Sequence, residues 1–353
     1  MNNPERILRF LSRRAQSVSP LLILMHDYPD PDALAAGYAL QYLAEKGFHI
    51  KSRMVYGGVI GRNENQEMVR VLKIPAHKLK TSDFKRYTNI ALVDTQPVFG
   101  NNPFPGNRKA TIVIDQHESV KRPNADLSVV DTELEATSVL MAGALLQRHL
   151  MIPAPLATAL VYGILTDTQN LQGVTNPTVI RTYADLLYLA DLKKLARIQN
   201  VSRSRKYFQA LSRAIRRASV RRRFIVAHLG HVESPDLVSQ ITDFLLTYDG
   251  MNWAFCTGRY EGSLHISLRS RSIRGRAGEV FRDIFHNRAH AGGHGRIGGG
   301  KIKVGHEAGE DAWRSVEENL TGVLAKRLHI PRKAPTYFPF GGDKVGERDF
   351  LRG

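Results

Sequence analysis

Cysteine is almost missing from this sequence, which contains only Cys256 in 353 residues. The scarcity excludes an internal disulfide framework and any metal site built from several thiolates of one chain. Long hydrophobic runs are missing too, because none approaches the roughly 20 apolar residues that a membrane-spanning helix needs. We therefore expect a chain that has no membrane partner.

The first 16 residues lack the apolar core and the small-residue cleavage site of a signal peptide. This absence predicts a cytoplasmic location. Acidic residues are few, since 33 Asp and Glu stand against 50 Lys and Arg and give a formal net charge of +17. Such an excess attracts polyanions such as nucleic acid or nucleotides. A generally basic proteome would produce the same charge without any such partner.

An unbroken apolar run at residues 21–25 predicts a parallel strand that is buried on both faces. Pro29 and Pro31 then predict a turn. Asp32 is well placed to N-cap the following helix, whose apolar residues keep helical spacing until Gly47. The segment therefore predicts a strand, a rigid turn and a helix.

One imidazole and two carboxylates, those of His26, Asp30 and Asp32, come together in this turn. Open parallel sheets bind ligands beyond the carboxyl ends of their strands, which is where the turn lies. The three side chains are therefore candidate metal ligands. The alternative is that both aspartates are only turn and cap residues and that His26 is an ordinary hydrogen-bonded histidine at a strand end.

Two further apolar strands end in residues of the same kind. The strand predicted at 89–93 ends at Asp94, and the strand predicted at 111–114 ends at the triplet Asp115, Gln116 and His117. Three strands of a βαβ pattern that each deliver acidic or imidazole groups at their carboxyl ends indicate a functional site.

Asp167 stands near the end of a predicted helix, residues 154–171, that is apolar nearly all round. An ionised carboxylate beside so much apolar surface is costly unless it is paired or bound to a metal. Its alternative role is that of a hydrogen-bonded carboxylate near a helix end.

The stretch from 193 to 223 contains 12 Lys or Arg residues and no Asp or Glu. It predicts a helical connector between two domains. Two interpretations stay open: a solvated linker helix, or a surface that faces a polyanion.

The second half predicts a mixed domain, with a strand from 224, a helix at 235–246 and a hairpin at 252–270. A glycine-rich stretch follows at 291–300, where seven of the ten residues are Ala or Gly. Its backbone could approach a phosphate closely and offer N–H groups to it. A flexible connector is the alternative.

Together these residues resemble the DHH phosphoesterase superfamily, in the subfamily with a DHH-associated C-terminal domain that includes RecJ exonucleases and nanoRNase/pAp phosphatases. The resemblance covers about residues 20 to 305 and follows the family's order of motifs. The motifs are His26-x-x-x-Asp30-x-Asp32, Asp94 after a strand, the triplet 115–117, Asp167, and Gly292-Gly293-His294.

The resemblance implies the α/β class, with a parallel-sheet N-terminal DHH domain linked by a helix to a smaller mixed α/β C-terminal domain. The implied segments are a DHH domain at 1–190, a basic helical linker at 191–222, a DHH-associated substrate-binding domain at 223–330 and an extended or disordered tail at 331–353.

Members of this family typically use two Mn²⁺ ions, and Mg²⁺ is an alternative. Carried across by motif, one ion would take His26, Asp30 and Asp94. The other would take Asp32, Asp94 and Asp167, with Asp94 bridging the two. Carboxylate and imidazole are suitable ligands for Mn²⁺.

The resemblance also implies roles for the remaining residues. His117 would assist the leaving group or position the phosphate, and Asp115 would act from behind the metal ligands. The phosphate of the substrate would be held by Arg269, Gly292, Gly293 and His294.

One departure stands in the triplet, where Gln116 occupies the place of a family histidine that binds the second metal. An amide oxygen can bind a hard cation, but we expect it to hold Mn²⁺ less well than imidazole. The second metal site would then be weaker, shifted towards Mg²⁺, or empty.

The expected function is that of a metal-dependent phosphodiesterase or phosphatase, which hydrolyses short oligonucleotides, linear dinucleotides or nucleoside 3′,5′-bisphosphates by metal-activated water. One alternative is a RecJ-like exonuclease whose basic stretch guides single-stranded nucleic acid. Another is a nucleotide sensor that lost catalysis through Gln116. A homodimer is left open as the assembly.

Overall fold

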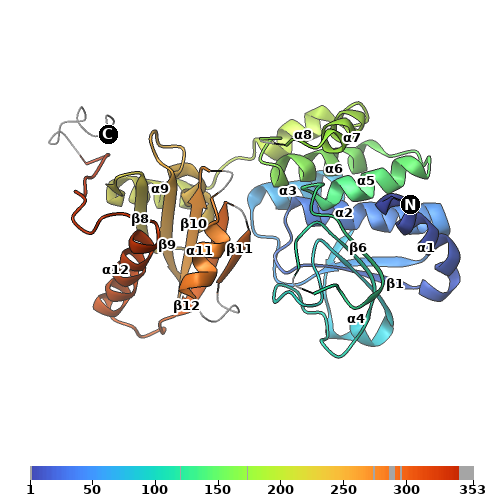
Figure 1. Ribbon diagram of the computed structural model, residues 1–353, viewed down its shortest axis with the longest axis horizontal. Coiled ribbons are helices and arrows are strands. Elements are labelled where there is room, and N and C mark those ends of the chain that lie inside the picture. Colours follow the sequence, from blue (N-terminus) through green and yellow to red (C-terminus); the bar gives the residue numbers. More distant parts are fainter. Residues whose placement is uncertain are drawn as a thin grey trace. The chain divides into compact units, whose positions relative to one another are not determined.

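The computed structural model describes residues 2–341 except 120, 173, 273–274, 286–290 and 295, and for 291–294 it describes the backbone only. The chain forms two compact units, which comprise residues 1–202 and 203–353 (Figure 1). Within the described residues, no helix combines the length and the apolar character that crossing a bilayer requires.

Unit 1 is built on a six-stranded sheet whose strands are all parallel, in the order β3-β2-β1-β4-β5-β6. The strands are β1 (Leu21–Met25), β2 (Ser52–Tyr56), β3 (Ala76–Lys78), β4 (Asn89–Val93), β5 (Ala110–Asp115) and β6 (Ala125–Val130). The strand order reverses between β1 and β4, so the topological switch point of the sheet lies between these two neighbours.

Helices cover both faces of this sheet. They are α1 (Asn3–Val18), α2 (Pro31–Tyr42) with a following π-helical turn (Leu43–Gly47), α3 (Asn63–Leu72), α4 (Thr81–Arg86), α5 (Thr137–Gln147), α6 (Ala154–Asp167), α7 (Pro177–Leu187) and α8 (Leu192–Gln199). Figure 1 shows α2, α5 and α6 on one side of the sheet and α4 on the other.

The apolar run of β1 is explained by this layering. Leu21 and Ile23 belong to the core cluster that packs against α2, α5 and α6. Leu22 and Leu24 belong to a separate cluster on the opposite face. Because successive side chains of a strand point to opposite faces, both sets of positions must be apolar.

The start of α2 differs from the sequence prediction. Asp30, and not Asp32, is the N-cap, and its Oδ1 accepts a hydrogen bond of 3.0 Å from the N–H of Ala33. The reason lies in Pro31, which occupies the first helical position, where its missing N–H costs nothing and its fixed φ suits the helix. Proline also disfavours helical geometry in the preceding residue, which leaves Asp30 extended.

Unit 2 is built on a second six-stranded sheet, in the order β11-β12-β10-β9-β8-β7. Its strands are β7 (Ser219–Arg221), β8 (Phe224–His231), β9 (Trp253–Tyr260), β10 (Ser263–Ser270), β11 (Ala291–His294) and β12 (Ile297–Lys303). The β8–β9 pair is parallel and the other pairs are antiparallel. The predicted α/β class, with a parallel sheet followed by a mixed C-terminal sheet, is therefore confirmed.

In the described part of unit 2, α9 (Arg205–Arg217) and α10 (Asp236–Leu245) cover one face of the sheet, and α11 (Ala277–Ile284) and α12 (Glu310–Arg327) cover the other. The division between the units falls at 202/203, inside the stretch 191–222 that was expected to be a linker helix. That stretch contains α8 in unit 1 and α9 and β7 in unit 2. In the tail, Tyr337 forms a bridge with Val220, and residues 342–353 lie outside the described part.

The glycine-rich stretch is a hairpin and not an open loop. Gly292 pairs with Gly299, and Gly293 pairs with Gly298, in the β11–β12 ladder. The sequence pattern missed these two strands because glycine is depleted in strands and has no side chain to pack. The neighbouring strand β10, which pairs with β12 over seven residues, supplies the partner that holds them.

A close helix contact yields the first prediction. In α6, a Cβ on Gly163 would lie 2.6 Å from Ser138 Oγ and 3.2 Å from the Cα of Asp32. Gly163→Ala should therefore push α6 away from α2 and α5 and destabilise unit 1 by about 1–3 kcal/mol, which urea unfolding measures.

The matched change is Gly322→Ala in α12, where a new Cβ meets no described atom within 4 Å. This variant should stabilise unit 2 by about 0.5–1 kcal/mol, because alanine loses less backbone entropy in a helix than glycine. A Gly163→Ala protein that unfolds at the wild-type urea concentration would contradict the close packing of α6.

Candidate metal centre

The side chains singled out in unit 1 meet at the switch point of its sheet. His26 follows β1, and Asp94 follows the neighbouring strand β4. Asp94 has a φ of 58°, a left-handed conformation that residues other than glycine seldom adopt. Its N–H donates a 2.9 Å hydrogen bond to the carbonyl of Ile114 in β5. Backbone strain of this kind is concentrated at functional sites.

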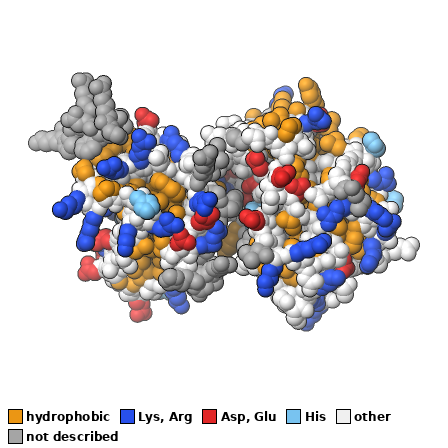
Figure 2. Space-filling view, in the orientation of Figure 1, with side chains coloured by type: hydrophobic (Ala, Val, Ile, Leu, Met, Phe, Trp, Pro, Cys, Tyr) orange, Lys and Arg blue, Asp and Glu red, His pale blue; other side chains and the backbone are white. Residues whose placement is uncertain are grey.

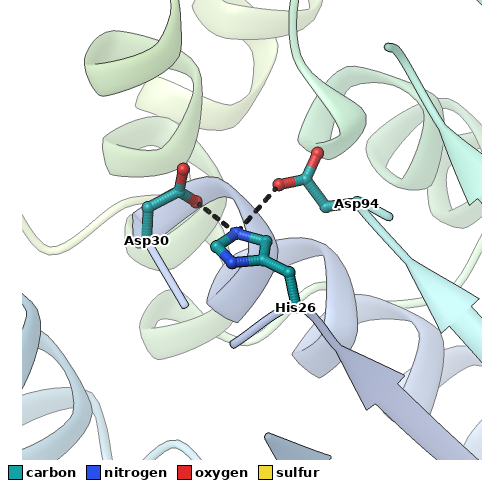
Figure 3. A group of neighbouring side chains, drawn as sticks. All are labelled: His26, Asp30 and Asp94. Atoms are coloured by element: carbon teal, nitrogen blue, oxygen red, sulfur yellow. Dashed lines mark ion pairs between the residues drawn. The ribbon is translucent and has the colours of Figure 1, made fainter. Parts of the chain in front are cut away.

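His26, Asp30 and Asp94 form the first cluster, in which ligand atoms of all three residues lie within 4.8 Å of one another (Figure 3). His26 Nε2 lies 3.8 Å from Asp30 Oδ1 and 3.5 Å from Asp94 Oδ2. His26 Nδ1 lies 2.8 Å from the carbonyl oxygen of Asp27. Since a carbonyl only accepts, Nδ1 carries the proton, and Nε2 is directed at the two carboxylates with its lone pair available for a metal.

A second cluster shares Asp94 and adds Asp115 and His117. His117 Nδ1 lies 2.8 Å from Asp115 Oδ1 and 3.6 Å from Asp94 Oδ1. Asp94 is thus the common member of two groups of potential ligands. The resemblance groups Asp94 with Asp32 and Asp167 for the second metal, and its bridging role between two ions stays a prediction.

Asp32 and Asp167 were expected to bind the second metal together with Asp94. Asp32 is fully buried, and its two oxygens accept hydrogen bonds from the N–H groups of Thr137 (2.7 Å) and Ser138 (2.9 Å). It therefore caps the N-terminus of α5, where N–H groups have no partner within the helix. A carboxylate oxygen has a further lone pair, so this contact leaves room for a metal. Its role as a metal ligand stays a prediction.

Gln116 contacts Asp167 directly. Its Nε2 donates a 2.7 Å hydrogen bond to Asp167 Oδ2 and lies 3.3 Å from His117 Nε2. The amide therefore stands beside the carboxylate that the resemblance assigns to the second metal. A half-turn of the amide would exchange its nitrogen and oxygen, and an oxygen ligand would be available there without backbone movement.

Two residues that the sequence analysis did not select support the clusters. Gln96 Nε2 donates to Asp115 Oδ2 at 2.7 Å and to the carbonyl of His117 at 2.8 Å. Thr137 Oγ1 donates to Asp94 Oδ1 at 2.8 Å. Gln96 lies two residues after Asp94, so a search for polar residues at the ends of predicted strands could have found it. Thr137 lies at the start of a distant helix, and no such pattern marks it.

Burial and mutual repulsion raise the pKa values of three carboxylates, whereas for Asp30 the hydrogen bond and charge of His26 outweigh burial and hold the pKa below its ordinary value. Burial, together with the charges of Asp94 and Asp30, raises the pKa of Asp32 to about 8. Burial also raises the pKa of Asp94, and it raises that of Asp167 well above its ordinary value with the help of the neighbouring carboxylates. Their raised pKa values mean that a cation that binds here competes with protons for these three carboxyl groups.

The pKa values of both histidines are raised, whereas burial alone would lower the pKa of an imidazole. Burial favours the neutral form of His117, but its hydrogen bond to Asp115 and the charge of Asp94 outweigh burial and raise its pKa to about 10. Burial likewise opposes the charged form of His26, and its contacts with Asp30 and Asp94 raise its pKa well above the usual value. Both shifts reflect the negative potential of the site.

The residues present fit a divalent cation. Imidazole and carboxylate suit Mn²⁺, and the excess of carboxylates favours a cation over protons as pH rises. The Asp30 side chain is 47% exposed, so the first cluster can be reached from solvent. The cluster of His26, Asp30 and Asp94 supplies one imidazole and two carboxylates for the first ion.

The candidate phosphate-binding residues lie in unit 2. The Arg269 side chain is buried, and it donates to Asp243 Oδ1 at 2.5 Å, to Ser267 Oγ at 2.9 Å and to the carbonyl of Leu268 at 3.1 Å. Gly292 and Gly293 lie in β11. The side chain of His294 lies outside the described part of the chain. Contact of these residues with a substrate stays a prediction.

Solved structures share this architecture. An exopolyphosphatase-related protein from Bacteroides fragilis superposes with a TM-score of 0.69 at 14% identity, over 92% of this chain and 97% of that protein. RecJ from Thermus thermophilus in complex with Mn²⁺ superposes with a TM-score of 0.53 at 13% identity, over 93% of this chain and 55% of RecJ. The chain has the fold of the DHH phosphoesterases.

Curated proteins also resemble this DHH-fold chain in sequence. An uncharacterized protein from Methanocaldococcus jannaschii is 31% identical over 307 residues, or 85% of this chain. A probable manganese-dependent inorganic pyrophosphatase from Streptococcus equi subsp. equi is 26% identical over 188 residues, or 50% of this chain. The matches span 62% and 57% of these curated relatives. No family model matches the chain.

The raised carboxyl pKa values predict that Mn²⁺ binds more tightly as pH rises. A bound cation favours the ionised carboxylates, so binding must displace protons at any pH below their raised pKa values. Titration calorimetry should show affinity rising from pH 6 through the pKa of Asp32, about 8, by up to about tenfold per pH unit for each proton displaced.

Asp126→Asn is the matched control, because Asp126 pairs with Lys109 in unit 1 and takes no part in either cluster. This variant should keep the wild-type dependence on pH. An affinity that stays constant between pH 6 and pH 9 would show that the carboxylates are already ionised before the metal binds.

Proposed function

We propose that this chain is a metal-dependent phosphoric ester hydrolase that acts on short oligonucleotides, linear dinucleotides or nucleoside 3′,5′-bisphosphates. The observation that carries the proposal is the His26, Asp30 and Asp94 cluster at the switch point of the parallel sheet. His26 Nε2 and the two carboxylates would hold one cation, and Asp94 is shared with the cluster that contains His117.

A divalent cation bound there supplies a Lewis acid, which lowers the pKa of a bound water and offsets the negative charge of a phosphoryl group. Asp115 orients His117 through the Nδ1 contact of 2.8 Å. Gln96 in turn holds Asp115 through its other oxygen. With its raised pKa, the His117 side chain keeps a proton that it can donate to the leaving oxygen or share with a phosphate.

The names of similar proteins support hydrolysis at phosphorus. RecJ in its Mn²⁺ complex, the exopolyphosphatase-related protein and the probable manganese-dependent pyrophosphatase share a metal or a phosphoryl substrate in their descriptions. Because this chain spans only part of the curated relatives, their substrates are not transferred to it, and the short nucleotide substrate is part of the proposal. Mn²⁺ is the proposed ion, with two ions per site.

The test is hydrolysis of a substrate series with Mn²⁺. The series contains pAp, 5′-phosphorylated dinucleotides, inorganic pyrophosphate and a labelled single-stranded oligomer. We expect turnover of one short nucleotide class, its loss on chelation, and a decrease of more than about 100-fold in Asp94→Asn, because that change weakens both clusters at once.

Asp126→Asn should retain wild-type turnover, since Asp126 lies outside both clusters. Degradation of the long oligomer in preference to the short substrates would instead identify a RecJ-like exonuclease. Hydrolysis that is unchanged in Asp94→Asn would rule out this metal centre as the catalytic site.

The contact between Gln116 and Asp167 favours a second candidate, a nucleotide sensor without turnover. The amide nitrogen binds the carboxylate that a second cation would need, and an amide is a weaker ligand than imidazole. A sensor would bind nucleotide in the presence of Mn²⁺ but would not hydrolyse it.

Gln116→His tests this point directly. Placing an imidazole beside Asp167 should raise the Mn²⁺ stoichiometry or tighten the weaker site by about tenfold or more, as measured by titration calorimetry. Gln116→Asn, which keeps the amide but shortens the side chain, is the control and should not gain affinity. Equal metal binding in both variants would mean that position 116 does not reach a metal.

A further inference from the structure

The charge of the whole chain does not by itself locate a partner surface. On the face shown in Figure 2, Lys and Arg side chains are scattered over both units with acidic side chains among them. A binding surface must therefore be identified from arginines that are grouped, held in position and left without acidic partners. Helix α9 of unit 2 meets these conditions.

Helix α9 buries one side and exposes the other. Ala210 and Ala214 are fully buried in the core that α9 forms with β8 and α10. The opposite side lines a groove of about 500 Å³. The residues of this groove are Arg205, Phe208, Gln209, Ser212, Arg213 and Arg216. They recur at the three- and four-residue spacing of one helix face.

A second hollow adjoins this groove. It has a volume of about 740 Å³, and its basic and imidazole lining comes from Arg213, Arg217, Arg259, His231 and His306. Because Arg213 lines both hollows, they form one continuous surface, which we call the α9 track. With 13 residues, α9 gives this track a length of about 20 Å.

Neutral acceptors hold two arginines of the track, Arg213 and Arg216. Arg213 donates from Nε to the carbonyl of Leu229 at 3.1 Å and from Nη2 to that of His231 at 3.0 Å. Arg216 Nη1 donates to Ser212 Oγ at 2.6 Å. Carbonyl and hydroxyl acceptors leave the positive charge in place, and a guanidinium has further N–H groups for an incoming oxyanion.

Arg259 provides the contrast within the same hollow. Its guanidinium binds Glu310 and Glu317 and lies 5.4 Å from the centre of the Trp313 ring. Among the described residues, no such ion pair is found for Arg205, Arg213, Arg216 or Arg217. The charge of the α9 track is therefore available to a polyanion.

The α9 track is separate from the glycine-rich hairpin that is proposed to hold the substrate phosphate. The second hollow reaches Glu261 and Gly262, at the turn that precedes β10. The hairpin lies at the far end of β10, where Arg269 pairs with Ile297. Eight residues of β10 separate these ends by about 23 Å, from the usual rise per residue of a strand.

We propose that the α9 track binds single-stranded nucleic acid, with phosphates on its arginines and a base against Phe208. The Phe208 side chain is 58% exposed in the middle of the track, where it offers a stacking surface. A basic groove interrupted by an aromatic ring is the combination that holds single strands without reading their sequence. This binding needs no metal, so it can be tested independently of the proposed hydrolase activity.

The experiment is fluorescence anisotropy with a labelled 12-nucleotide single strand, the full chain and excess EDTA, which prevents hydrolysis. The triple variant Arg205→Ala/Arg213→Ala/Arg216→Ala should bind at least about tenfold more weakly. Its plot of log affinity against log salt should lose about two units of slope, because each lost phosphate contact removes about 0.7.

The charge-matched control is Lys326→Ala/Arg332→Ala/Lys333→Ala, which removes three exposed basic residues of unit 2 outside the track. It should keep wild-type affinity within about twofold, as expected if only the grouped arginines contact phosphates. Equal losses in both triple variants would overturn the proposal, because binding would then follow net charge alone.

Phe208→Ala tests the stacking contact separately, with no change of charge. We expect about tenfold weaker binding and an unchanged salt dependence. Phe244→Ala removes another exposed ring, from α10, and should bind as the wild type does. Displacement of the oligonucleotide by AMP or inorganic phosphate at equal concentration would overturn the proposal in favour of a small-anion pocket.

Discussion

The accumulation of negative charge at the carboxyl edge of one parallel sheet is the constraint on which unit 1 depends. Asp32, Asp94 and Asp115 are buried there, and Asp30 and Asp167 are partly buried beside them. Carboxylates removed from water repel one another and favour their protonated forms. Much of the surrounding structure consists of groups that donate hydrogen bonds to these oxygens.

Those donors lie on segments that are far apart in the sequence of unit 1. The start of α5 supplies two backbone N–H groups to Asp32, and Thr137 supplies its hydroxyl to Asp94. Gln96 and Gln116 supply amides. The imidazole of His117, which contacts Asp115, completes the set. The donors orient the oxygens without cancelling their charge, so the site keeps the negative potential that attracts a divalent cation.

The two units carry opposite kinds of chemistry. In the described residues, both groups of potential metal ligands lie in unit 1, whereas the hollows lined by arginine lie in unit 2. The proposed catalysis requires a fixed, largely buried geometry, which strand ends and a switch point provide. The proposed binding of a flexible strand requires exposed charge on a stable helix, and α9 provides that. The proposed track uses only some of the basic residues in the composition, and the others are distributed over both units.

The sequence alone predicted several buried strands and the polar residues that follow them, because buried parallel strands are continuous apolar runs and their polar neighbours are conspicuous. Residues 21–25 and 89–93 were bounded correctly, and the resemblance to the DHH phosphoesterases grouped His26, Asp30 and Asp94. Tertiary structure decided the contacts that connect distant segments. The cap that Asp32 places on α5 joins residues more than 100 positions apart, and no local pattern encodes it.

Tertiary structure likewise decided the glycine-rich hairpin, since β12 forms by pairing with β10 and β11 by pairing with β12, and not through their own propensity. The basic stretch was visible in the sequence, but the side of α9 that stays exposed depends on where Ala210 and Ala214 pack. Local rules predict a strand or helix where the apolar pattern is strong, and burial against partners remote in the chain decides the weaker elements and which atoms meet.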